Sequence, residues 1–213
     1  MKNIIGIIVS YIFIIVVVIL AKLLEKQGKE ASRKFIHIIL SNWWFIAMYF
    51  FTNWIWASIV PLSFIIINYI SYKSNLIKVM EREKNDGLGT VYYAISLFAI
   101  SVFTFGVIHK PEVGLVSVLV MGYGDGLAGV VGRTIESKTF KVGNTTKSVA
   151  GSMTMFLITF MLVSIFLGAK GIELFAIKSI IIAAILTIVE AVSVKGTDNL
   201  TVPLSVCLIL SLM

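Results

Sequence analysis

The sequence predicts an all-α integral membrane protein with seven or eight transmembrane helices. Apolar residues make up 58% of the 213 residues and charged residues only 14%, whereas an average soluble domain has about 25% charged residues. The apolar residues gather in runs long enough to cross a hydrocarbon core of about 30 Å, and the basic residues are concentrated in every second loop between the runs. Because this composition does not change along the chain, we treat residues 1–213 as one polytopic domain.

Seven apolar runs have the length of a membrane span, and an eighth is shorter. We expect all of them to be helical, because backbone groups in lipid must satisfy their own hydrogen bonds. The first run is interpreted as a span and not as a signal peptide, since no small-residue cleavage pattern follows it. The expected spans are residues 4–21, 35–51, 54–72, 88–108, 113–132, 152–167 and 172–193, and the short run is residues 200–213.

The basic residues predict which side of the membrane each loop occupies. The loops after the first, third, fifth and seventh spans hold fourteen Lys and Arg residues, and the other side holds four. The positive-inside rule places the richer set in the cytoplasm and the N-terminus outside. We therefore expect a multi-pass protein of the cell membrane with its active-site loops in the cytoplasm. The apolar and charged residues of 72–86 also predict an amphipathic segment on the lipid headgroups.

Three acidic residues, far apart in sequence, are expected at this cytoplasmic face. Asp125 lies within the fifth span, where an ionised carboxylate costs at least about 2.5–3.5 kcal/mol. Glu190 lies near the cytoplasmic end of the seventh span, and Asp198 follows it. Three carboxylates suit a Mg²⁺ ion that carries phosphates. The alternatives are a polar tie between helices for Asp125, an interfacial side chain for Glu190 and a helix cap for Asp198.

The segment around Asp125 and the loop that follows it predict a nucleotide site. Glycines beside Asp125 allow a ligand or another helix to approach the backbone, and Lys147 lies just before the sixth span, where free N–H groups at a helix start bind phosphate. The alternative is a solvated loop with Ser or Thr capping the span. A Rossmann motif and a P-loop are both excluded by the sequence context. The candidate nucleotide-binding residues of this part are Gly124, Gly126, Arg133, Lys141, Thr146, Ser148, Gly151 and Ser152, and Asn199, which follows Asp198, is a further candidate.

A basic pair and a histidine open the second span on the same side. Arg33 and His37 are four residues apart and share a helical face, with Lys34 between them. Such a group can bind phosphate, and the histidine can transfer a proton. The alternative is the ordinary basic flank of a span.

Four segments in this order resemble the dolichol kinase and phytol kinase family of membrane lipid kinases. They are ASRKFIH at 31–37, GDGLAGVVGR at 124–133, TKSVAGS at 146–152 and EAVSVKGTDNLTVP at 190–203. The same arrangement is similar to that of phosphatidate cytidylyltransferases. Together the four segments extend over most of the chain.

The resemblance implies transfer of the γ-phosphoryl group of CTP, or of another nucleoside triphosphate, to a lipid alcohol with Mg²⁺. The acceptor would be an isoprenoid alcohol of the polyprenol or phytol type, or a similar lipid such as diacylglycerol. Asp125 with Glu190 or Asp198 would hold Mg²⁺, Lys147 would neutralise phosphate, and Glu190, Asp198 or His37 would take the proton. The alternatives are a cytidylyltransferase that makes CDP-diacylglycerol and a small membrane transporter. We expect no nucleic-acid partner, and a homo-oligomer is compatible with the sequence.

Overall fold

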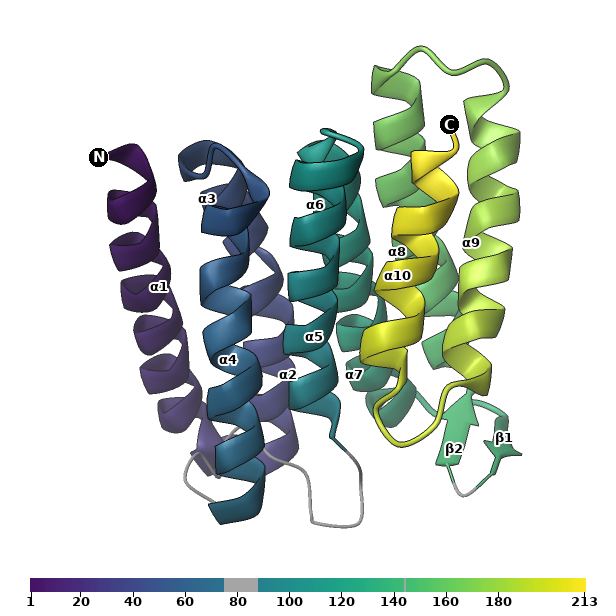
Figure 1. The fold of residues 1–213 in the computed structure, drawn as a ribbon. Coiled ribbons are helices and arrows are strands. Elements are labelled where there is room, and N and C mark those ends of the chain that lie inside the picture. Colours follow the sequence, from purple (N-terminus) through teal and green to yellow (C-terminus); the bar gives the residue numbers. More distant parts are fainter. Residues whose placement is uncertain (75–87, 144) are drawn as a thin grey trace.

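The computed structural model describes residues 1–74, 88–143 and 145–213 as a bundle of helices whose axes are roughly aligned (Figure 1). In chain order the elements are α1 (Lys2–Leu24), η1 (Glu25–Gln27), α2 (Lys29–Ser41), α3 (Trp43–Phe50), α4 (Trp54–Ser74), α5 (Gly89–Val102), η2 (Phe103–Val107), α6 (Pro111–Leu119), η3 (Val120–Asp125), α7 (Gly126–Thr134), β1 (Thr139–Val142), β2 (Thr145–Ser148), α8 (Val149–Ala169), α9 (Phe175–Val192) and α10 (Asp198–Ser211). From residue 75 onward, the predicted amphipathic segment at 72–86 lies outside the described residues.

The prediction of an all-α, multi-pass membrane protein is confirmed. Within the described part of the chain, six helical stretches are long and apolar enough to cross a membrane, and they coincide with six of the expected spans. They are Lys2–Leu24, Trp54–Ser74, Gly89–Val107, Pro111–Thr134, Val149–Ala169 and Phe175–Val192. The helix α10 has 14 residues, or about 21 Å at 1.5 Å per residue, so it is as short as its apolar run indicated.

The expected span 35–51 is not one continuous helix. It divides at Asn42 into α2 and α3. The Asn42 side-chain amide donates to the carbonyl of Ile39 at 3.1 Å and to the hydroxyl of Tyr123 at 3.0 Å. An asparagine that bonds to nearby backbone competes with the helical hydrogen-bond pattern, which explains why apolarity alone gave the wrong continuity here.

The residues expected to form the loop before the sixth span include a short antiparallel hairpin. In it, β1 pairs with β2 in the register Thr139↔Ser148 and Val142↔Thr145. Gly143 has a φ of +56°, a left-handed conformation that glycine adopts readily in tight hairpin turns. The hairpin returns the chain to the end of the bundle and brings Lys147 over it.

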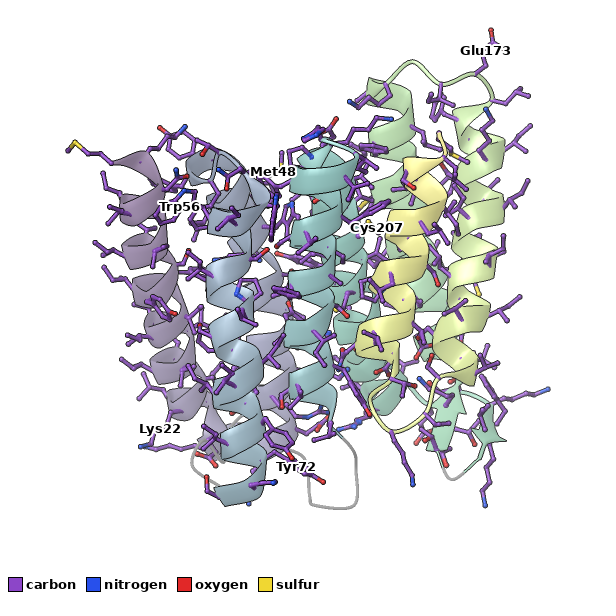
Figure 2. All side chains as sticks on the ribbon, viewed as in Figure 1. Lys22, Met48, Trp56, Tyr72, Glu173 and Cys207 are labelled. Atoms are coloured by element: carbon purple, nitrogen blue, oxygen red, sulfur yellow. The ribbon has the colours of Figure 1, made fainter. Side chains whose placement is uncertain are left out.

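The two ends of the bundle differ in what they carry. Lys22 and Tyr72 lie toward the end with the hairpin, whereas Glu173 lies at the other end (Figure 2). Both chain termini also lie toward the Glu173 end (Figure 1). Assignment of the hairpin end to the cytoplasm remains a prediction from the distribution of basic residues.

Candidate active site at the hairpin end of the bundle

Asp125 ends a π-helical segment in the most buried span. The segment η3 joins α6 to α7, and such wide turns frequently occur at functional sites. The carboxylate is 6% exposed, and its Oδ2 lies 3.2 Å from Lys34 Nζ and 3.3 Å from His37 Nε2. The helix α2 therefore supplies the positive charge and the hydrogen-bond donor that make this buried carboxylate tolerable.

Glycines at a helical spacing allow α2 to come this close to η3 and α7. At Gly122, Gly126 and Gly129, a Cβ atom would lie 2.3–2.5 Å from an α2 side chain, closer than side-chain atoms can approach. Gly124 lies instead against α8, where its Cβ would be 2.8 Å from Met155 Sδ. Gly124 and Gly126, predicted to bind nucleotide, thus lie at contacts between helices.

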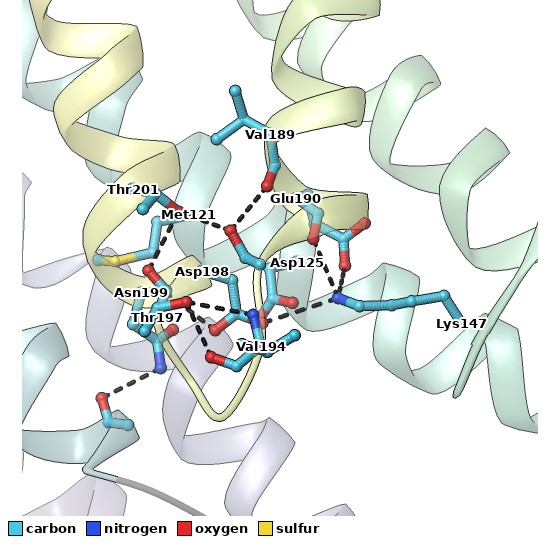
Figure 3. A network of polar contacts seen from close by, with 12 residues as sticks. Met121, Asp125, Lys147, Val189, Glu190, Val194, Thr197, Asp198, Asn199 and Thr201 are labelled. Carbon is cyan, nitrogen blue, oxygen red and sulfur yellow. Dashed lines mark hydrogen bonds and ion pairs between the residues drawn. The ribbon is translucent and has the colours of Figure 1, made fainter. Parts of the chain in front are cut away.

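The three predicted acids meet at this end of the bundle. Asp125, Glu190 and Asp198 are buried, and one carboxylate oxygen from each lies within 4.8 Å of the other two. The ends of η3, α9 and the start of α10 deliver them, and Figure 3 shows the three side chains converging. Oxygen ligands at such spacing suit a hard divalent cation. Their assignment as metal ligands remains a prediction.

Lys147 reaches into this group of acids from the hairpin. Its ammonium forms an ion pair with Glu190 and lies 3.8 Å from Asp198 Oδ2 (Figure 3). Burial on its own would lower the pKa of Lys147, but the charges of Glu190 and Asp198 outweigh it and hold that pKa above its ordinary value. The side chain therefore stays charged at neutral pH and compensates part of the acidic charge.

The start of α8 does not offer the free backbone N–H groups that the sequence suggested. The N–H groups of the first three residues of the helix already donate within the protein. Their acceptors are the Lys138 carbonyl for Val149 (2.9 Å), the Ser137 hydroxyl for Ala150 (3.1 Å) and the Ser148 hydroxyl for Gly151 (3.1 Å). Ser148 is thus the cap of the helix, as the alternative interpretation held. At the start of α8 a phosphate would therefore meet side chains, among them the buried Ser152 hydroxyl, which has no partner among the described residues.

A polar cavity surrounds the three acids. It encloses about 1820 Å³ of empty space, the open space at its mouth included. Eleven of the predicted site residues line it: Arg33, Lys34, Asp125, Arg133, Thr146, Lys147, Ser148, Gly151, Ser152, Glu190 and Asp198. The structure does not bring Lys141 to this cavity, because it is exposed on β1. His37 and Asn199 line a different cavity.

Glu30, which the sequence analysis did not select, lines the polar cavity. Its carboxylate accepts from Arg33 Nε at 2.9 Å and lies 2.7 Å from Arg133 Nη2. Burial alone would raise the pKa of Glu30, but these two arginines outweigh it and hold that pKa below its ordinary value. The sequence carried a signal for this residue, since Glu30 precedes Arg33 by three positions on one helix.

A second, apolar cavity lies next to the polar one. It encloses about 890 Å³ between the packed pair α1 and α2 and the packed pair α4 and α5. Arg33 lines both cavities. The walls are formed largely by Ile14, Ile36, Leu40, Trp43, Val60, Pro61, Phe64, Ala94 and Leu97. Side chains of these types occur throughout a membrane protein, so nothing in the sequence distinguished them.

His37 connects the two cavities. It lines the apolar cavity, while its Nε2 lies 3.0 Å from the Met121 carbonyl and 3.3 Å from Asp125 in the polar one. Both partners of Nε2 accept hydrogen bonds, so in the neutral ring Nε2 carries the proton and Nδ1 is the bare acceptor. The edge of the ring packs against Tyr93, with centroids 5.0 Å apart.

Comparisons with known proteins identify relatives over most of the chain. It is 31% identical over 206 residues to the phytol kinase of Synechocystis sp., covering 91% of this chain and 84% of that protein. It is 32% identical to a probable phytol kinase 1 of Oryza sativa subsp. japonica and 28% identical to phytol kinase 1 of Arabidopsis thaliana. Each plant match covers 84% of this chain but less than two thirds of the plant protein. No protein-family model matches the chain, and no solved structure matches it.

Proposed function

The chain belongs to the phytol kinase family. On that premise we propose that it transfers the γ-phosphoryl group of a nucleoside triphosphate, preferably CTP, to an isoprenoid alcohol. One observation supports this proposal above the others. A polar cavity that holds three acids and several cations lies beside an apolar cavity, and His37 and Arg33 stand between them. Such a pair of cavities suits a reaction between a charged nucleotide and an apolar alcohol.

The side chains of the polar cavity fit a divalent cation with a triphosphate. Asp125, Glu190 and Asp198 would hold Mg²⁺, as their carboxylate spacing allows. Magnesium bound there would neutralise charge on the phosphate oxygens. Arg33, Arg133 and Lys147 line the same cavity and would bind phosphate oxygens through charge-assisted hydrogen bonds.

We assign the proton transfer to His37. As the alcohol oxygen bonds to the γ-phosphorus, the bond from that phosphorus to the bridging oxygen breaks and the nucleoside diphosphate leaves. The hydroxyl proton passes to Nδ1 of His37, the nitrogen left bare by the contacts of Nε2 with Met121 and Asp125. Glu190 is less suited to this role, since it is tied to Lys147 and does not line the apolar cavity.

Product labelling tests the proposal. Purified protein in detergent is given Mg²⁺, γ-labelled or α-labelled CTP or ATP, and phytol, a longer polyprenol or diacylglycerol. The proposal expects label from the γ-position in an isoprenoid alcohol, with CTP the better donor. Label from the α-position in a parallel reaction with phosphatidate as the acceptor would show a cytidylyltransferase instead, and transfer to diacylglycerol alone would overturn the assignment of the acceptor.

A further inference from the structure

We propose that the apolar cavity is the acceptor site, in which the alcohol lies with its hydroxyl on Asn199 and its tail running along α2, α4 and α5 toward Trp43. This inference rests on the proposed function and deepens it, because it says where the lipid binds and which side chain holds its hydroxyl. It assigns Asn199, predicted to contact the nucleotide, to the other substrate.

The cavity has the polarity gradient of a lipid alcohol. Its polar lining residues lie toward the hairpin end of the helices, among them Arg33, His37, Asn68, Tyr72 and Asn199. The lining residues farther along the same helices are apolar. From Arg33 to Trp43 the cavity follows the chain for ten residues, or about 15 Å at 1.5 Å per residue. A hydroxyl at the first end and an apolar tail along the rest match this gradient.

An unpaired acceptor marks the polar end. Asn199 is 5% exposed, and its amide nitrogen donates to the Gly89 carbonyl at 3.0 Å. The amide oxygen of the same side chain has no hydrogen-bond partner among the described residues. A buried acceptor without a donor is unfavourable because it has lost its hydrogen bonds to water, and an alcohol in this cavity brings one O–H donor. The hydroxyl therefore has a binding partner that the protein alone leaves unsatisfied.

The position of Asn199 also places the hydroxyl beside the acids. Asp198 lines the polar cavity and Asn199 lines the apolar one, and the Asn199 backbone N–H donates to Asp198 Oδ1 at 3.0 Å. While the hydroxyl donates to Asn199, both lone pairs of its oxygen remain available to the phosphorus. Asn199 is thus a positioning residue. It holds the single hydroxyl proton in the bound complex, and as the new bond forms the hydroxyl turns this proton from Asn199 to Nδ1 of His37, which lines the same cavity.

The closing experiment compares three variants with two acceptors. Leu97→Trp fills the middle of the cavity, Asn199→Ala removes the unpaired oxygen, and Ile66→Trp adds the same bulk at a position of α4 that is 56% exposed. We expect Leu97→Trp to raise KM for a C20 alcohol at least tenfold, while KM for the nucleotide and kcat/KM for a C5 alcohol change less than threefold. Asn199→Ala should raise KM for both alcohols about tenfold and leave KM for the nucleotide unchanged, and Ile66→Trp should have no effect.

A photoreactive C20 alcohol, cross-linked to the wild-type protein and mapped by mass spectrometry, tests the site even if a variant fails to fold. Labelling of Phe64 and Leu97 that excess phytol suppresses supports the proposal. Labelling confined to outward residues such as Ile66, or unchanged KM values in Leu97→Trp, overturns it. If the wild-type protein phosphorylates no alcohol, the proposed function fails, while the cross-links still decide whether the cavity binds the lipid.

Discussion

The two cavities are held open by different means. In the polar cavity buried charges lie beside charges of opposite sign. Lys34 pairs with Asp125, and Lys147 pairs with Glu190. In the apolar cavity no lining carboxylate or lysine is present among the described residues, and the space lies between two helix pairs. Charges in a low-dielectric interior must be paired at close range, so the polar site is defined by the distances between its charged groups. The apolar site is defined by shape and by a few polar atoms at one end.

The largest effect should come from removing the carboxylate of Asp125, which lines the polar cavity and contacts His37 of the apolar cavity. We expect Asp125→Asn to lower kcat/KM by about 10²–10³, equivalent to about 2.7–4 kcal/mol, because it weakens the cation site and no longer orients His37. Cross-linking of the photoreactive alcohol should persist, since the apolar walls are unchanged. Glu112→Gln, which breaks the Glu112–Lys170 ion pair at the other end of the bundle, is the matched control and should retain full activity. Equal activity in the two variants would remove Asp125 from the mechanism.

Lys147→Met should have the next largest effect. It removes the cation that pairs with Glu190 and lies 3.8 Å from Asp198 Oδ2, so in EDTA the thermal midpoint should fall by several degrees. Added Mg²⁺ should recover much of this loss if the three acids bind it, because a ligand of the folded state stabilises that state. Activity should fall about a hundredfold even with Mg²⁺. A midpoint that Mg²⁺ does not change, in both the variant and the wild type, would contradict the cation site.

The contact between α2 and η3 forms part of the boundary between the two cavities, and Gly122 makes that contact possible. A Cβ at Gly122 would lie 2.3 Å from Ser41 Cβ, so Gly122→Ala should cost about 1–3 kcal/mol of stability. It should also impair binding of both substrates, which no variant confined to one cavity would do. Gly168→Ala, whose Cβ would make an ordinary 3.6 Å contact with Phe175, is the control. A shift in KM for one substrate alone would show that the two sites do not share this boundary.

The smallest effect should follow from Glu30→Gln, and it should depend on pH. The folded-state pKa of Glu30 is lowered, so its ion pairs stabilise the protein above the ordinary glutamate pKa of about 4.3 and lose that effect as the pH falls through the lowered value. At pH 7 the variant should be less stable by at most about 1 kcal/mol, because the pair is partly exposed to solvent. Denaturation midpoints of variant and wild type should converge below about pH 4. A difference that grows toward low pH would contradict the assignment.

The comparison also explains how much the sequence could predict. Asp125 and Glu190 were recognisable because charged residues are rare in membrane spans, and Lys147 because it lies just before the sixth span; the structure brings the three together. The apolar cavity was not recognisable, since Leu97 and Phe64 resemble the residues that face lipid. The break at Asn42 and the partners of the N–H groups at the start of α8 depend on contacts with Tyr123, Ser137 and Lys138, which hydropathy and spacing do not contain.

The most direct test of the central claim is the stereochemical course at the transferred phosphorus. If both substrates lie in adjoining cavities and the alcohol attacks the γ-phosphorus in line, each transfer inverts that centre. A nucleoside triphosphate made chiral at the γ-position with oxygen isotopes and thiophosphate should therefore give a lipid phosphate of inverted configuration. Retention would mean that the phosphoryl group first moves to the protein, with His37 the first residue to examine, and would contradict direct transfer between the two cavities.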